Sequence, residues 1–354
     1  DEMSHETHQY TYSLVHLNAD MQPSDLQSYD FVDGFTTQDI IDYEHSGNTQ
    51  RNYTHYRFTF PNEDMILKAS GNYAIKIYED GNPDKIVAIA CFCVVDAKVG
   101  IETHVKSNTE IEFNGRYQQL DIDINTIGLN IRDPHDITLV VRQNNRHDNE
   151  VHITQPTYLE GTRLRYYNQR ELIFEGGNEY RHFDNYSIYF AGTNIDRVIY
   201  DRNDYHAILF TDENRTQSAY TYEPDANGQF IIHAERTSNS DTEAEYMWVH
   251  WTLPMERPLL NGRIYVGGEM FFNQLNSDNL MQYDADNKCY WLTSLVKQGG
   301  HDYQYWYTNN GSKKATLQPI EGSHWETKNE YSVYVYYRPF GCRYDQLIGL
   351  VIVH

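Results

Sequence analysis

Apolar and polar residues alternate with a period of two along most of this chain. Between His55 and Phe60, three aromatic residues alternate with three polar ones, and Pro61-Asn62 ends the run. Because successive side chains of a strand point to opposite faces, this period predicts half-buried β-strands. The same signal recurs at residues 73–77, 120–124, 137–141, 188–190, 207–210, 230–232, 246–251, 264–266, 290–292, 303–307, 331–337 and 348–353.

Two segments depart from this alternation. Residues 86–95 form a nearly continuous apolar run after a turn at residues 79–83, which predicts a hairpin whose second strand is buried on both faces. Cys91 and Cys93 share one face of that strand, and their spacing suits buried apolar positions better than a disulfide. Residues 36–43 are the best candidate for a helix.

The spacing of the runs decides the fold class. Runs follow one another every 10 to 20 residues or so, with Gly, Asn, Asp and Pro between them, which is typical of sandwiches rather than of βαβ units. Segments 96–100 and 236–245 resemble linkers. We therefore predict an all-β chain of tandem immunoglobulin-like or early-set β-sandwich domains at residues 1–97, 98–240 and 241–354.

Composition restricts the partners. The 354 residues carry 28 Lys and Arg against 51 Asp and Glu, a formal charge of -23, so nucleic acid and anionic lipid would be repelled. A basic partner and simple solubility both explain the charge. Four cysteines do not make a disulfide scaffold at this length, although Cys289 and Cys342 could pair. No apolar run is long enough for a membrane helix.

Motifs for catalysis or metal binding are weak. No phosphate loop, nucleophile elbow or zinc-protease helix is present, and the turn at Gly176-Gly177 lacks a following helix. The densest histidine group could hold zinc but is better explained by a solvated strand and turn; it consists of His135, His147, Asp148, Glu150 and His152. We predict no metal, no cofactor and no catalytic residue. An unrecognised carboxylate pair of a carbohydrate-active enzyme stays an alternative.

The C-terminal third resembles the early-set, glycogen-binding sandwich modules of starch enzymes. A strand at residues 290–295 is followed by Lys297-Gln298-Gly299 and by an aromatic strand at 303–307. Sugar rings stack on aromatic faces, so this resemblance implies glycan binding. Phe271-Phe272-Asn273 stands where those modules carry a tryptophan, and aromatic core packing is the alternative. The candidate glycan-binding residues are Trp291, Lys297, Tyr303, Tyr305 and Trp306.

Longer strings, in order along nearly the whole chain, resemble one family specifically, the type 9 secretion system plug proteins of Bacteroidetes. Met21 stands where that family usually has tryptophan. The strings are Asn18-Ala19-Asp20-Met21-Gln22-Pro23-Ser24-Asp25-Leu26, Asn48-Thr49-Gln50, Tyr53-Thr54-His55-Tyr56, Phe60-Pro61-Asn62-Glu63-Asp64, Ser70-Gly71-Asn72-Tyr73, Gln143-Asn144, Gly176-Gly177-Asn178-Glu179-Tyr180-Arg181, Glu243-Ala244-Glu245-Tyr246, Lys297-Gln298-Gly299 and Ile320-Glu321-Gly322-Ser323.

The resemblance implies a non-enzymatic, exported protein of the periplasm. It would associate with a very large outer-membrane β-barrel translocon and close its periplasmic opening. Members usually begin with a signal peptide and further N-terminal strands, so we expect the first domain to be N-terminally trimmed. A glycan-binding protein is the alternative function.

A stopper needs a docking surface, and tyrosine and arginine are enriched at interfaces. An exposed edge strand offers a second docking mode. The candidate interface residues are Tyr166, Tyr167, Asn178, Glu179, Arg181, Tyr334, Tyr336 and Arg338.

Overall fold

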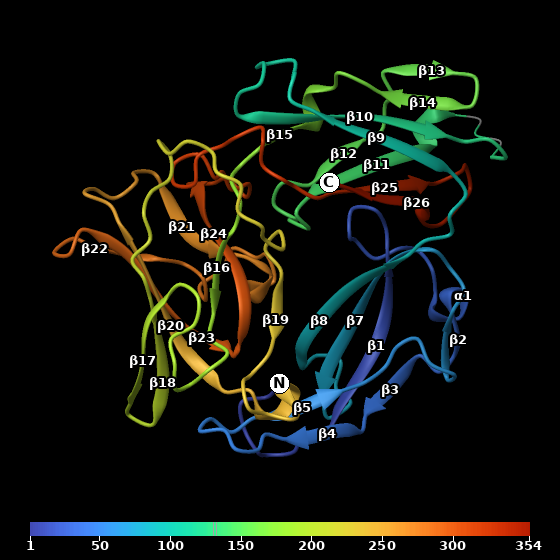
Figure 1. Ribbon diagram of the computed structural model, residues 1–354. Helices are drawn as coiled ribbons and strands as arrows, with labels where there is room; N and C mark the ends of the chain where they lie inside the picture. The colour runs from blue at the N-terminus through green and yellow to red at the C-terminus, as the bar shows by residue number, and fades with distance from the viewer. Residues whose placement is uncertain (130, 132) are drawn as a thin grey trace.

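The regular secondary structure of the protein is almost entirely β-strand, as predicted, in a computed structural model that describes residues 1–129, 131 and 133–354 (Figure 1). Its strands form three bodies, each with its own hydrophobic core. The first body contains strands β1–β8, the second β9–β15 with β25 and β26, and the third β16–β24. The short helices α1 (Ser28–Phe31) and α2 (Ser240–Glu243) are one turn each, and no described helix is long and apolar enough to cross a membrane.

The first body is built on one antiparallel sheet of order β3-β1-β7-β8. Tyr12, Tyr73 and Ile75 of this sheet pack against Phe31 and Met65 from the segments that cover it. The strands are β1 (Tyr10–Leu17), β2 (Val32–Gly34), β3 (Thr37–Ile40), β4 (Asp42–His45), β5 (Thr54–Arg57), β6 (Met65–Leu67), β7 (Gly71–Glu79) and β8 (Ile86–Val94).

The helix predicted at residues 36–43 is wrong, because this segment forms β3 and the start of β4. Residues Thr37–Ile40 pair with β1 in antiparallel register. Ile40 is buried whereas the next residue, Ile41, is exposed, which is the two-residue period of a strand. Pairing with a neighbouring strand overrides the weak local helix preference.

The prediction that residues 86–95 are buried on both faces is also wrong. β8 is an edge strand, and Ile86, Val87 and Ile89 are 44%, 52% and 57% exposed. Cys91 is exposed and Cys93 half-buried, and all four cysteines are free, so Cys289 and Cys342 do not pair. An apolar run reports hydrophobicity but not whether another layer covers it.

The second body is a sandwich of two sheets. A five-stranded sheet centred on β10 faces a four-stranded sheet of order β12-β11-β25-β26, and their inner faces share one core. The strands are β9 (Gly100–Lys106), β10 (Tyr117–Asn125), β11 (Ile137–Gln143), β12 (Val151–Ile153), β13 (Tyr158–Glu160), β14 (Arg163–Tyr166), β15 (Ile173–Glu175), β25 (Tyr331–Tyr337) and β26 (Gln346–Val353).

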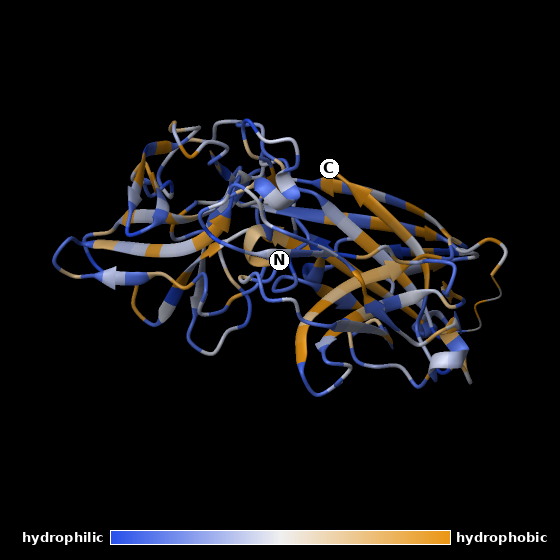
Figure 2. Cartoon of the chain, turned by 90° about the horizontal axis from the view of Figure 1, so that it is seen from below, coloured by the Kyte–Doolittle hydropathy of each residue, from blue (hydrophilic) through white to orange (hydrophobic). Residues whose placement is uncertain are grey.

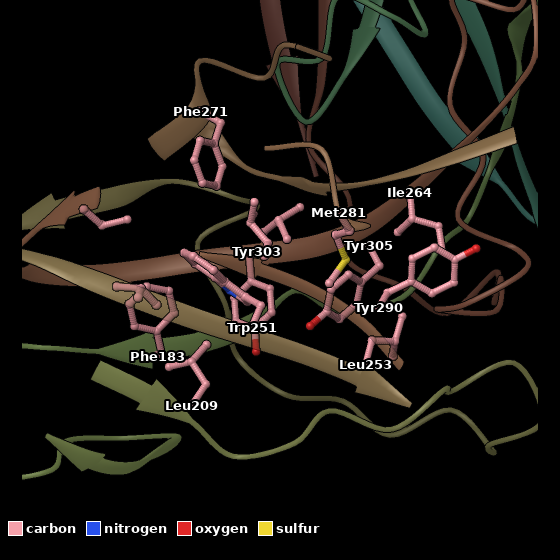
Figure 3. Close-up of a cluster of buried hydrophobic side chains, with 14 of the residues drawn as sticks. Phe183, Leu209, Trp251, Leu253, Ile264, Phe271, Met281, Tyr290, Tyr303 and Tyr305 are labelled. Carbon is pink, nitrogen blue, oxygen red and sulfur yellow. The ribbon is translucent and has the colours of Figure 1, made fainter. Parts of the chain in front are cut away.

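The third body places a sheet of order β17-β18-β20-β23-β22 against strands paired with the long β24. Trp251 lies in the core between them, edge-on to Phe183 and Tyr303 (Figure 3). The strands are β16 (Arg181–Asp184), β17 (Ile195–Asp201), β18 (Asp204–Leu209), β19 (Phe230–Ile232), β20 (Tyr246–Pro254), β21 (Gly262–Gly267), β22 (Gln282–Asp284), β23 (Cys289–Lys297) and β24 (Gly299–Asn309).

The sheets group the chain differently from the predicted segments 98–240 and 241–354. β11 pairs with β25, and β18 pairs in parallel with β20 across residue 240. The third body is therefore inserted into the second, between β15 and β25 (Figure 1). The predicted boundary at residue 240 rests on the polar run at residues 236–245, which is a local feature of the sequence. Pairing between strands that are distant in sequence leaves no such local signal.

Two tryptophans of the third body test this packing. We expect Trp251→Ala to lower the free energy of unfolding by about 3–5 kcal/mol, because Trp251 is fully buried. Trp291→Ala, on the neighbouring strand, should cost less than about 1 kcal/mol because its side chain is exposed. Denaturant unfolding of both variants measures the difference, and equal losses would contradict the assigned register.

Candidate functional site

Burial separates the predicted site residues into three groups. Most are buried and contribute to packing. Trp291 and Arg338 are exposed, and Tyr167, Tyr334 and Arg181 are intermediate. The buried ones are Tyr166, Asn178, Glu179, Tyr336, Lys297, Tyr303, Tyr305 and Trp306. The buried set therefore forms no exposed docking or sugar-binding face.

Arg181, a predicted interface residue, lies in a buried ion cluster. Its guanidinium donates to Asp212 Oδ1 at 2.8 Å and to both oxygens of Glu321 at 3.0 and 3.1 Å. Arg215 adds a second cation 2.6 Å from Glu321 Oε2. A carboxylate that is fully buried requires such pairing, because an unpaired charge is costly away from water.

The predicted sugar-binding tyrosines belong to the same cluster. The hydroxyls of Tyr303 and Tyr305 donate to Asp212 Oδ2 at 2.7 and 2.6 Å. Burial, with the charge of Asp212, raises the pKa of both tyrosines, so they stay neutral donors. Burial alone would raise the pKa of Glu321, but Arg181 and Arg215 outweigh it and hold that pKa below its usual range.

Asn178 and Glu179 lie where the chain crosses from the second body into the third. Asn178 Nδ2 donates to the carbonyl of Glu321 at 2.8 Å, and Arg215 donates to the carbonyl of Glu179 at 2.8 Å. Asn329 lies where the chain returns from the third body to the second. Its Nδ2 donates to the carbonyl of Gly176 at 2.7 Å, which joins the two crossings. This segment is a structural connection between the bodies.

The remaining predicted interface residues also mainly pack against other parts of the protein. Tyr166 belongs to the core of the second body, and Tyr167 lies under the guanidinium of Arg165. Tyr336 donates to Asn72 Oδ1 at 2.9 Å, in a small cluster between the first and second bodies that also includes Tyr334. Only Arg338 is exposed, and its guanidinium lies 3.6 Å from Asp345.

Lys297 and Trp306 have structural surroundings as well. Lys297 Nζ lies over the rings of Tyr53 and Tyr246, and burial lowers its pKa to about 8. Trp306 lies under Arg146, whose Cζ is 4.4 Å from its ring centroid. Of the five predicted glycan-binding residues, the structure leaves Trp291 on the surface.

Trp291 lines a groove of roughly 590 Å³ in the third body. Trp248 and Phe272 contribute aromatic surface, and Asn276, Asp278 and Gln282 contribute polar groups to its lining. Phe272 is 77% exposed and has a φ of 55°, an unusual backbone conformation for a bulky residue. The sequence pattern missed Trp248, although its alternation with buried Met247 and Val249 places it on the outer face.

The groove follows an incomplete sheet edge. β22 pairs with β23 only at Cys289–Trp291, so among the described residues Leu292–Leu295 have no strand partner on that side. Aromatic surface, polar side chains and free backbone groups therefore meet in one concave site, which is the usual composition of a ligand site.

Among the described residues, no three His, Cys, Asp or Glu side chains are grouped as a metal site. The predicted histidine group is divided between separate ion pairs. Asp148 pairs with buried Arg146 at 2.7 Å, and Glu150 pairs with Arg142 and His152.

One carboxyl group has a raised pKa. Burial raises the pKa of Asp225 to about 6, with a smaller contribution from Asp302. Its oxygens accept hydrogen bonds from the backbone N–H groups of Tyr180 and Asn227, so Asp225 organises a loop.

The ion cluster predicts a large cost for removing one charge. Glu321→Gln should lower the free energy of unfolding by about 3–5 kcal/mol, because Arg181 and the partly buried Arg215 would both lose their shared, fully buried counter-charge. Glu256→Gln, at an exposed ion pair with Lys288, is the matched control and should cost less than about 1 kcal/mol.

The pH dependence of that variant has a defined sign. The pKa of Glu321 is lowered by folding, so its contribution is present above its unfolded value of 4.5 and is lost as pH falls towards the folded value. Acid unfolding curves should therefore differ between the wild type and Glu321→Gln above pH 4.5 and converge below it. A constant difference would contradict this role.

Comparison with known proteins identifies the first body and the whole fold. Residues 1–96 match the family model described as the type 9 secretion system plug protein first domain. A solved structure of a hypothetical protein from Parabacteroides merdae is 39% identical, with a TM-score of 0.96, over 98% of this chain and 88% of that one.

No curated protein matches this chain. The early-set resemblance of the C-terminal third stays a prediction. The match of the first body confirms the family resemblance, and the solved relative extends the shared fold over the second and third bodies. The chain belongs to the type 9 secretion system plug protein family.

Proposed function

We propose that this protein is a non-enzymatic subunit that binds the outer-membrane translocon of a type 9 secretion system from the periplasm and closes it. The observation that carries the proposal is the match of residues 1–96 to the plug first domain. A stopper acts by filling an opening and being released, so it needs a rigid folded block and a docking surface rather than reacting groups.

The contacts between the bodies support this mechanical role. Tyr53 of the first body donates to the carbonyl of Ala244 in the third at 2.9 Å. Glu245 accepts hydrogen bonds from the backbone of Gln50 and Arg51. Asp345 of the second body accepts from the backbone of Ala19 at 2.9 Å. These contacts favour bodies that move as one block, which a stopper requires.

Charge favours a basic or neutral docking region on the partner. A formal charge of -23 repels anionic surfaces and speeds encounter with cationic ones. The same charge keeps the released protein soluble in the periplasm.

The test is affinity purification of the tagged full-length protein from detergent-solubilised outer membranes of its own organism. We expect mass spectrometry to identify a very large outer-membrane β-barrel subunit. An unrelated tagged periplasmic β-sandwich of similar charge serves as the control. Absence of that barrel, or its equal recovery with the control, would contradict the proposed function.

The groove beside β23 favours a second candidate function, glycan binding. Trp291 and Phe272 offer exposed rings for stacking, and Asp278 and Gln282 can accept or donate hydrogen bonds to hydroxyls. Calorimetric titration with starch-type and β-glucan oligosaccharides tests it. Binding that Trp291→Ala abolishes would support the function, with Phe340→Ala on the second body as the exposed aromatic control. Absence of heat with the wild type would exclude these glycans.

A further inference from the structure

β8 is an unpaired sheet edge with an unusual composition. It pairs with β7 on one side, and among the described residues no strand pairs with its other side. Its nine residues, Ile86–Val94, include no charged residue and no proline. Coloured by hydropathy, the strand is hydrophobic along its whole length (Figure 2). Such an edge is a template for another strand.

Some other edge strands of the protein carry charged residues, whereas the edge strands β19 and β26 carry none. β3 carries Asp39, β13 carries Glu160, and β17 carries Asp196 and Arg197. Natural proteins use such charges to prevent strand addition at an edge. β8 lacks this protection, as do β19 and β26, but β19 is only three residues long and β26 is mostly buried or half-buried. Among these three uncharged edges, β8 is therefore the long and exposed one.

The strand is anchored at one end and open at the other. Near its C-terminal end, Phe92 stacks on Tyr73 with ring centroids 5.2 Å apart, and Cys93 packs beside Tyr334. The first six residues, Ile86–Cys91, are exposed on both faces. A partner therefore meets a strand already held in extended form, which lowers the entropic cost of docking.

Charge decides which strand fits. Ile89 lies opposite Lys76 of β7, and the ion pairs among the described residues include none to Lys76. An added apolar strand complements this edge. Lys76 offers one local site for an acidic side chain, while the surface as a whole favours a basic or neutral partner. A second copy of the chain is disfavoured, because each copy carries a formal charge of -23.

We propose that β8 is the docking edge of this protein, where an extended, apolar strand of the translocon barrel subunit adds to the β3-β1-β7-β8 sheet. This inference rests on the proposed function and specifies its contact. The free N–H and C=O groups of β8 bond to the added strand, and Ile86, Val87 and Ile89 pack on its side chains. β8 lies on the side of the first body that is nearer the third body (Figure 1).

The experiment compares two exposed isoleucines in the membrane purification described above. Ile89→Glu should lower recovery of the barrel subunit by roughly tenfold or more, because a charge would be buried at the docked edge. The variant should fold normally, since the new carboxylate faces Lys76. Ile199→Glu, on the edge strand β17, is the matched control and should leave recovery unchanged.

Native thiols give a second measurement that does not depend on substitution. In the complex, Cys91 of β8 should be protected from N-ethylmaleimide, whereas Cys289 of β23 should react as in the free protein. Equal recovery with Ile89→Glu, or reactive Cys91 in the complex, would overturn the docking edge while leaving the proposed function intact.

Three further outcomes would also overturn the assignment of β8 as the docking edge for the barrel subunit. Failure of the wild type to recover the barrel would refute the proposed function and this inference together. A dimer in sedimentation that Ile89→Glu abolishes would assign the edge to a second copy and overturn the inference. If Cys91 is protected in the purified full-length protein without the barrel, a segment of the same chain covers the edge of β8. That result would also overturn the inference.

Discussion

The buried carboxylate of Glu321 is the constraint on which the rest of this structure depends. It pairs with both Arg181 and Arg215. These two ion pairs hold the start of β16 and the loop after β18 against the segment that contains Glu321. Asp212 extends the cluster to the two central tyrosines of β24. The carbonyls of Glu321 and Glu179 fix the crossing from the second body. One charge thus holds together the end of the inserted body at which the chain enters it from the second body.

Insertion makes the second and third bodies mechanically dependent. The chain leaves the second body after β15 and returns to it at β25, and the two crossings are hydrogen-bonded to each other through Asn329 and Gly176. The first body then contacts both, through Tyr53 on one side and Asn72 on the other. Polar contacts of this kind resist sliding better than an apolar interface, because each donor would lose its partner. A rigid block is the physical requirement of a stopper.

Against this rigid background, two surfaces are incompletely covered, and they differ in chemistry. The edge of β8 is apolar and uncharged, whereas the groove beside β23 mixes aromatic rings with amide and carboxylate groups. A high net charge keeps a protein with an exposed apolar edge from self-association, because copies repel one another. The charge and the unprotected edge are therefore compatible, and together they favour a foreign strand as the partner.

The sequence by itself predicted many of the strands and the family resemblance, although it predicted a helix where β3 lies and a strand at residues 188–190, where none forms. Alternation in β20 gave the buried Met247, Val249 and Trp251 in the observed register, and a period of two is a local property of a strand. Tertiary structure alone decided coverage: β24 is buried at nearly every position although it contains His, Asp and Gln, whereas the far more apolar β8 is largely exposed. It also converted Tyr303, Tyr305 and Arg181 from predicted site residues into a buried cluster. Which surfaces are covered depends on contacts between residues far apart in the chain, and no local pattern records them.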